Sequence, residues 1–125
     1  MATRIAARAS DDERLLTSAI STIADFWRLG NAALGGVLGV SPATASRLRH
    51  GQSRLDARSK SFEAAQYLLR LFRGLDALMG SDDDAARRWL GAVNLDLEAR
   101  PLDLIGSFKG LMRVCDYVDA HRARV

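Results

Sequence analysis

The chain has 125 residues, of which 48% are hydrophobic and 26% are charged, and this is the composition of a folded globular protein. Its net charge of +3 is too small to indicate a partner by itself, so the distribution of charge along the chain carries more information. A single cysteine excludes an internal disulfide, and no apolar run approaches the ~18 residues of a membrane helix, so we expect a protein of the reducing cytoplasm that does not enter a membrane.

Residues 1–9 carry Arg4 and Arg8 with no apolar stretch behind them. This pattern argues against a secretory signal and predicts a flexible basic arm. Ser10 is followed by three acidic residues, which is typical of a capped helix start. We therefore expect the first helix to begin at Ser10 and to end near Gly30.

Residues 31–50 have the pattern of a helix-turn-helix. Gly39 stands where the turn needs positive φ, Ser41 and Pro42 restart the helix as cap and first residue, and Gly51 ends it. Gly35 is small enough for close packing. The residues expected to face the core of the pair are Leu34, Leu38, Val40, Ala45 and Leu48.

The outward face of the second helix combines small side chains with arginine, and residues 41–60 carry five basic side chains against one acidic one. Small residues let a helix enter a DNA major groove, and arginine can pair with guanine. We expect Arg47 to read a base, Ser41 to hold a phosphate, and Arg49 and Arg54 to clamp the backbone. The candidate DNA-binding residues are Ser41, Ala43, Thr44, Ser46, Arg47, Arg49 and Arg54. The alternative is a helical hairpin with a purely structural role.

Residues 61–79 form the most apolar segment, with two adjacent apolar stripes at helical spacing. Such a helix lies between the two halves of the chain, forms a subunit interface, or does both. Gly80 ends it, and Ser81 is expected to cap the next helix. We assign the three aspartates 82–84 to helix initiation and not to metal binding, because the alternating ligands of a calcium loop are absent.

The last part of the chain predicts a helix start at Pro101 and a final helix in which Cys115 is a buried structural thiol. Gly106 and Gly110, four residues apart, predict close helix packing. No catalytic or phosphate-binding motif is present, so we expect neither an enzyme nor a bound cofactor or metal.

The second half also resembles the toxin-binding domain of the MbcA/ParS/Xre antitoxin family. The residues that carry the resemblance are Trp89, Leu90, Asn94, Leu97, residues 101–105 (Pro-Leu-Asp-Leu-Ile), Gly110, Val114, Tyr117 and Val118. Together with the helix-turn-helix, the resemblance covers about residues 10–120. It implies an all-α fold with an N-terminal Xre-like helix-turn-helix region at 10–60 and a small helical dimerisation and toxin-binding region at 61–125.

The resemblance implies an antitoxin that dimerises, covers the NAD pocket of a RES-domain toxin encoded by the neighbouring gene, and represses its own operon by binding a palindromic operator. NAD would be the substrate of the toxin and not a ligand of this chain. The C-terminal helix and tail would face the toxin, and the candidate residues are Asp103, Lys109, Arg113, Asp116, Tyr117, His121 and Arg122. The alternative is a stand-alone dimeric helix-turn-helix repressor without a toxin, and the neighbouring gene distinguishes the two.

Overall fold

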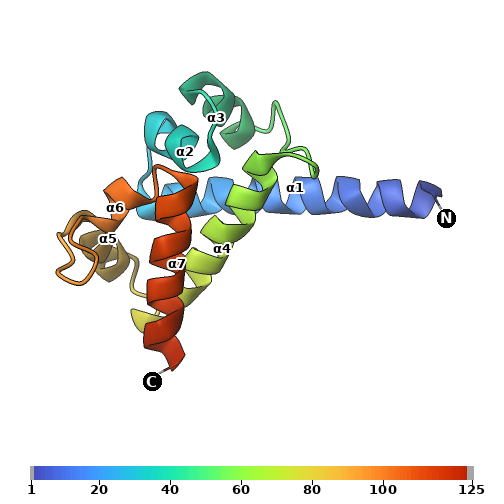
Figure 1. Ribbon diagram of the computed structural model, residues 1–125. Helices are drawn as coiled ribbons and strands as arrows, with labels where there is room; N and C mark the ends of the chain where they lie inside the picture. Colours follow the sequence, from blue (N-terminus) through green and yellow to red (C-terminus); the bar gives the residue numbers. More distant parts are fainter. Residues whose placement is uncertain (1, 124–125) are drawn as a thin grey trace.

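Helices α1 to α7 make up the fold in the computed structural model, which describes residues 2–123 (Figure 1). In chain order they are α1 (Ala2–Trp27), α2 (Asn31–Leu38), α3 (Pro42–Arg49), α4 (Lys60–Leu78), α5 (Asp83–Gly91), α6 (Pro101–Leu104) and α7 (Phe108–Ala123). Within this range there is no strand, only one isolated β-bridge between Asn94 and Ala99. The all-α prediction is therefore confirmed. Over the same range, no helix has both the length and the apolar character needed to cross a bilayer.

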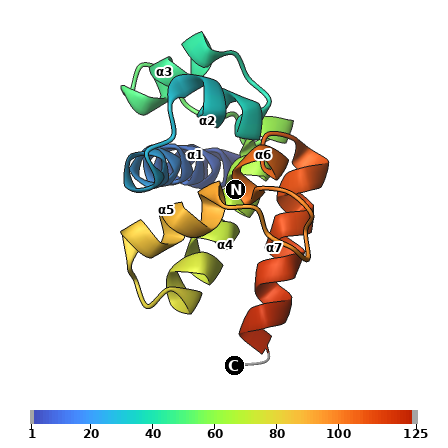
Figure 2. The same cartoon turned by 90° about the vertical axis from the view of Figure 1, so that its left-hand side faces the viewer.

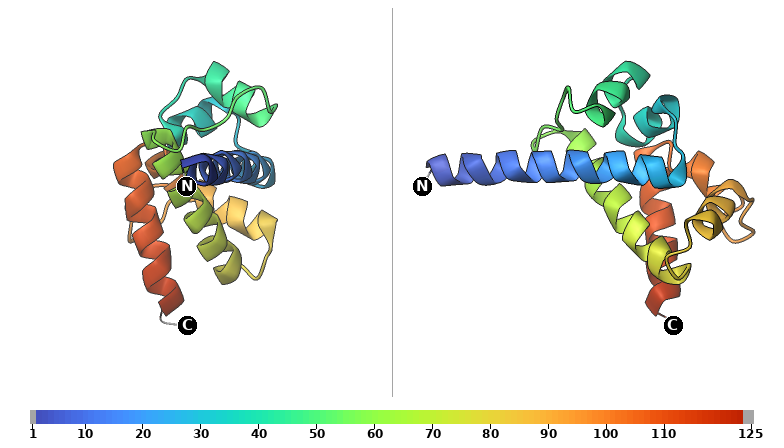
Figure 3. Two further views of the ribbon diagram at one scale, coloured as in Figure 1. Left: turned by 90° about the vertical axis from the view of Figure 1, so that its right-hand side faces the viewer. Right: turned by 180° about the vertical axis from the view of Figure 1, so that it is seen from behind.

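Helix α1 begins earlier than the sequence predicts. The expected arm at residues 1–9 is helical from Ala2 onward, whereas Met1 lies outside the described residues. Residues 2–9 contain four alanines and two arginines, which are strong helix formers, so no cap is needed at Ser10. The capping prediction was wrong, because the Ser10 hydroxyl accepts a hydrogen bond from Arg54 instead (2.9 Å). The first half of α1 projects beyond the other helices (Figure 3).

Helices α2 and α3 form the predicted helix-turn-helix, built by local backbone chemistry. Gly39 adopts φ +71° at the turn, and the Ser41 side chain accepts from the Thr44 backbone N–H (3.1 Å) ahead of Pro42. A Cβ on Gly35 would lie 2.6 Å from the Val40 carbonyl oxygen, so only glycine fits there. Of the five predicted core residues, Leu34, Leu38, Ala45 and Leu48 are buried and Val40 is half-buried.

Helix α4 is the centre of the fold, and this explains its wide apolar surface. It packs against α1, α2, α5 and α7, with α2 and α3 on one side of α1 and α5 and α7 on the other (Figure 2). Leu68, Leu71 and Leu75 are fully buried in these contacts. The expectation that this helix lies between the two halves of the chain is thus confirmed.

The start of α5 differs by one residue from the prediction. Asp82, not Ser81, is the capping residue, and its carboxylate accepts from the Ala85 N–H (3.1 Å). Ser81 has φ +61° because the chain turns back after Gly80, and its hydroxyl donates to the Asp76 carboxylate (3.0 Å). Asp83 and Asp84 occupy the first turn as expected. Among residues 2–123 no group of three or more His, Cys, Asp or Glu side chains is arranged to hold a metal ion.

Helices α6 and α7 meet closely at Gly110. Pro101 is the first residue of α6, as predicted. A Cβ on Gly110 would lie 1.9 Å from the Leu104 carbonyl oxygen, so this glycine lets α7 start directly against α6. Helix α7 then packs along α4 through Leu111, Val114 and Val118. The close packing predicted for this glycine is confirmed.

Cys115 is buried at 1% exposure, as predicted, and burial raises the pKa of its thiol to about 11. Its Sγ–H donates to the Tyr67 carbonyl oxygen (3.3 Å). The unfolded chain releases this proton at lower pH than the folded chain, so the free energy of unfolding should fall as pH rises from about 9 towards 11. Urea denaturation at pH 8 and pH 10 tests this. The decrease in the free energy of unfolding from pH 8 to pH 10 should be smaller for Cys115→Ala than for the parent. An equal decrease in both proteins would show that the Cys115 thiol does not cause it.

Candidate functional site

The exposed face of α3 presents the side chains that the sequence predicts for DNA binding. Ser41, Ala43 and Arg47 are exposed, and Thr44 is half-buried beside them. The Arg47 guanidinium donates to the Thr44 hydroxyl (2.9 Å), which also accepts from the Ser41 hydroxyl (3.0 Å). These hydrogen bonds hold Arg47 across the first turn of α3, where its remaining N–H groups face solvent. Ser41, Ala43, Thr44 and Arg47 therefore form one continuous surface, called the α3 face below.

Ser46 lies at the edge of the α3 face. It is half-buried, and its hydroxyl lies 3.3 Å from Nδ1 of His50, which in turn lies 2.7 Å from the Ser46 carbonyl oxygen. Arg54 lies further away, in the segment after α3, where it donates to Ser10 of α1. It is exposed and adds positive charge next to α1 and not on α3.

Arg49 does not belong to the α3 face, although the sequence predicts a phosphate clamp there. Its side chain is 21% exposed and points back to α1, where it pairs with Asp25 (2.9 Å) and donates to the Leu29 carbonyl oxygen (2.6 Å). The reason is a long-range partner, since Asp25 precedes Arg49 by 24 residues. Arg49 holds α3 against the end of α1.

We therefore expect Arg49→Ala to destabilise the fold by about 1–3 kcal/mol, because charge-assisted hydrogen bonds to a part-buried guanidinium are lost. Arg47→Ala removes the same charge from the exposed face and should leave the melting temperature nearly unchanged. Thermal unfolding followed by circular dichroism compares the two variants. Equal melting temperatures for Arg49→Ala and the parent would show that Arg49 is not a structural residue.

The predicted toxin-facing residues are spread over α6 and α7. Asp103 lies on α6, not on the last helix, and forms a bidentate pair with Arg100 (2.8 and 2.9 Å), which lowers the pKa of the Asp103 carboxyl. The exposed members on α7 are Lys109, Arg113, Asp116 and Arg122, and the half-buried members are Tyr117 and His121. Among them, Tyr117 and His121 contact each other, with their ring centroids 4.2 Å apart.

Tyr117 is the centre of a small aromatic cluster on the side of α7 that faces α5. The Trp89 ring stacks on it from α5 at 6.3 Å, and the Tyr117 hydroxyl donates to the Asp96 carboxylate (2.8 Å). Trp89 itself is half-buried. The cluster ties α5, α7 and the loop between α5 and α6 together.

The loop at residues 92–100 joins α5 to α6. In the structure it exposes two large apolar side chains, Val93 and Leu95. One signal could have identified it, namely two aliphatic residues around an asparagine that can form a side-chain turn.

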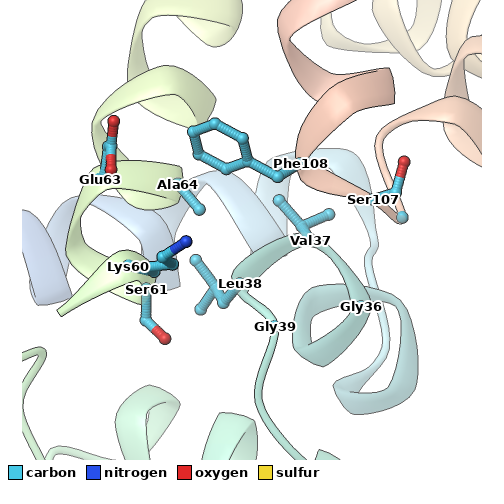
Figure 4. A pocket seen from close by; sticks show the side chains of 11 residues that line it. Gly36, Val37, Leu38, Gly39, Lys60, Ser61, Glu63, Ala64, Ser107 and Phe108 are labelled. Atoms are coloured by element: carbon cyan, nitrogen blue, oxygen red, sulfur yellow. The ribbon is translucent and has the colours of Figure 1, made fainter.

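A hollow of about 400 Å³ marks the junction between the helix-turn-helix and the C-terminal helices (Figure 4). Its lining comes from the end of α2, the start of α4 and the start of α7, and it includes Leu38, Lys60 and Phe108. Next to it, a Cβ on Gly36 would lie 3.7 Å from the Gly106 Cα. Helix α2 is also in direct contact with α7.

Two family models match the chain, and together they cover almost all of it. The Antitoxin Xre-like helix-turn-helix domain matches residues 6–70, and the Antitoxin Xre/MbcA/ParS C-terminal toxin-binding domain matches residues 74–124. A search of curated proteins gives no match. The first matched region contains the α3 face, and the second contains the aromatic cluster and α7. The chain therefore belongs to the Xre family of antitoxins and combines a DNA-binding helix-turn-helix with a toxin-binding domain.

Proposed function

We propose that the chain is the antitoxin of a RES-domain toxin that degrades NAD, and that it represses its own operon as a homodimer. The observation that carries the proposal is the coexistence of an uncovered α3 face and an Xre/MbcA/ParS toxin-binding region in one helical body. The toxin is encoded by the neighbouring gene, and NAD is its substrate. Both partners place the antitoxin in the cytoplasm.

On the DNA side, Arg47 pairs with a base edge in the major groove, and Ala43 and Thr44 contact thymine methyl groups or phosphates. Ser41 and the N–H groups at the start of α3 hold a phosphate. Ser46 lies at the edge of this contact, and Arg54 contacts the DNA backbone. Helix-turn-helix proteins bind two half-sites about one DNA turn apart as dimers, and this supports a homodimer on a palindromic operator.

On the toxin side, α7 covers the entrance to the NAD pocket of the partner. The residues proposed to contact the toxin are those predicted from the sequence: Asp103, Lys109, Arg113, Asp116, Tyr117, His121 and Arg122. What supports these residues is their position, since the exposed ones lie within the region that matches a toxin-binding domain. Truncation of α7 is no test of this role, since it would remove Leu111, Val114 and Val118 from the core.

The proposal is tested by expressing the neighbouring gene with and without the antitoxin and measuring growth and cellular NAD. Co-expression should restore both, and the double variant Arg113→Glu with Asp116→Lys, which keeps the core intact, should restore them less well. A reporter driven by the operon's promoter should be repressed by the antitoxin alone. If the antitoxin represses the promoter but does not change the growth or the NAD level of cells that express the neighbouring gene, the result would instead favour the stand-alone repressor.

A further inference from the structure

The loop at residues 92–100 exposes the most solvent-accessible large apolar side chain among the described residues. Leu95 is 89% exposed and Val93 is 65% exposed. This loop lies at the edge of the molecule, beside α5 and α6 (Figure 1). Single exposed aliphatic side chains are common on protein surfaces, so exposure alone does not indicate a role. What distinguishes these two is the way in which the loop is held.

Three sets of interactions fix the loop around Leu95. The Asn94 side-chain oxygen accepts from the N–H groups of Asp96 (2.9 Å) and Leu97 (3.0 Å), and the Asn94 N–H donates to the Ala99 carbonyl oxygen (3.0 Å). Leu97 points inward and is buried. The loop is therefore a closed, hydrogen-bonded turn with one leucine anchored in the core and another held in water.

The loop is also attached to α7, the helix proposed to face the toxin. Asp96 accepts the hydrogen bond of Tyr117, whose ring lies between Trp89 and His121. Leu95 thus precedes a residue that is bonded directly to the aromatic cluster. The loop is therefore joined to the Tyr117 side of α7, and both lie within the region 74–124 that matches a toxin-binding domain.

We propose that Leu95, assisted by Val93, is an apolar anchor that inserts into an apolar depression on the toxin, with Tyr117 and His121 at its border. Burial of a leucine that is otherwise in water supplies binding free energy, and the closed turn keeps the entropy cost of ordering the loop small. Anchors of this kind, central and surrounded by weaker contacts, dominate many interfaces. The inference rests on the proposed function for the identity of the partner.

The test uses the full chain and the purified product of the neighbouring gene, with the dissociation constant measured by calorimetry. Leu95→Asp should weaken the complex roughly 30-fold or more, Val93→Asp should weaken it less, and Leu95→Met should bind like the parent. Leu15→Asp is the matched control: Leu15 is 58% exposed on α1, outside the loop, and should retain parental affinity. All variants should keep the parental melting temperature and promoter affinity.

The outcomes separate the two proposals. If the parent chain does not bind the neighbouring product, the proposed function fails and the anchor fails with it. If the parent binds and Leu95→Asp binds equally well, only the anchor is wrong. If Leu95→Asp instead converts the antitoxin alone to a smaller oligomer, the loop contacts a second copy of the chain and the proposed occupant is overturned.

Discussion

Replacing Gly110 with alanine is expected to destabilise the fold by about 3 kcal/mol, because of all the glycines described it is the one at which an added Cβ would meet the closest atom. The added Cβ would lie 1.9 Å from the Leu104 carbonyl oxygen, which belongs to the backbone and cannot rotate away. Helix α7 would have to move away from α6 and loosen its packing along α4. For a chain of this size, the expected loss of melting temperature is roughly 10 °C, measured by calorimetry or circular dichroism.

Gly91→Ala is the matched control for this substitution. Gly91 is the last residue of α5, and a Cβ there meets nothing within 4 Å. Alanine has the higher helix propensity, so this variant should melt at or slightly above the parental temperature. A melting temperature of Gly110→Ala within 2–3 °C of the parent, a shift of roughly half a kcal/mol, would mean that the α6–α7 joint relaxes freely.

Replacing Arg47 with alanine is expected to weaken binding to the operator by about 1–3 kcal/mol, or roughly 5- to 150-fold. The reason is the loss of a guanidinium that the Thr44 hydroxyl holds over the α3 face. Fluorescence anisotropy with the operator and with a scrambled duplex, at one fixed salt concentration, measures the effect. The loss should be much larger on the operator, because a base contact carries the specificity.

Arg73→Ala controls for net charge, since it removes an exposed arginine from α4 and not from α3. It should affect the operator and the scrambled duplex equally and weakly. If Arg47→Ala also weakened binding to both duplexes equally and only slightly, the base contact would not lie on the α3 face. The melting temperatures of both variants should match the parent, which excludes unfolding as the cause.

The parts of the fold that the sequence predicts correctly are those governed by neighbouring residues. Gly39, Ser41 and Pro42 act within one turn of the backbone, so their pattern is sufficient to place the helix-turn-helix. The two adjacent apolar stripes of α4 are wide enough to contact neighbours on several sides, and the central position of this helix follows from the width of its apolar surface. The α3 face is predictable for the same reason, because it is what remains after the core positions are assigned.

The errors concern partners that are distant in the sequence. Ser10 and Arg49 were assigned roles on local pattern alone, yet each is engaged by a residue far along the chain, Arg54 and Asp25 respectively. Ser81 fails for a related reason, since the left-handed turn that follows Gly80 moves the cap to Asp82. The asparagine between two aliphatic residues could have indicated a turn at Asn94, but the exposure of Leu95 depends on where Leu97 and Tyr117 fix the loop, and these are contacts with distant parts of the chain.

The boundary between the two matched regions falls inside α4, between residues 70 and 74, and this limits how the protein can be recombined. A chimera joined there would combine half of one antitoxin's central helix with half of another's, and each half would meet neighbours selected for a different partner. Exchange of DNA specificity between relatives should therefore succeed by grafting the few exposed positions of α3. Exchange of toxin specificity should likewise follow from transplanting the loop at residues 92–100 and the exposed positions of α7, with the shared helical scaffold left whole.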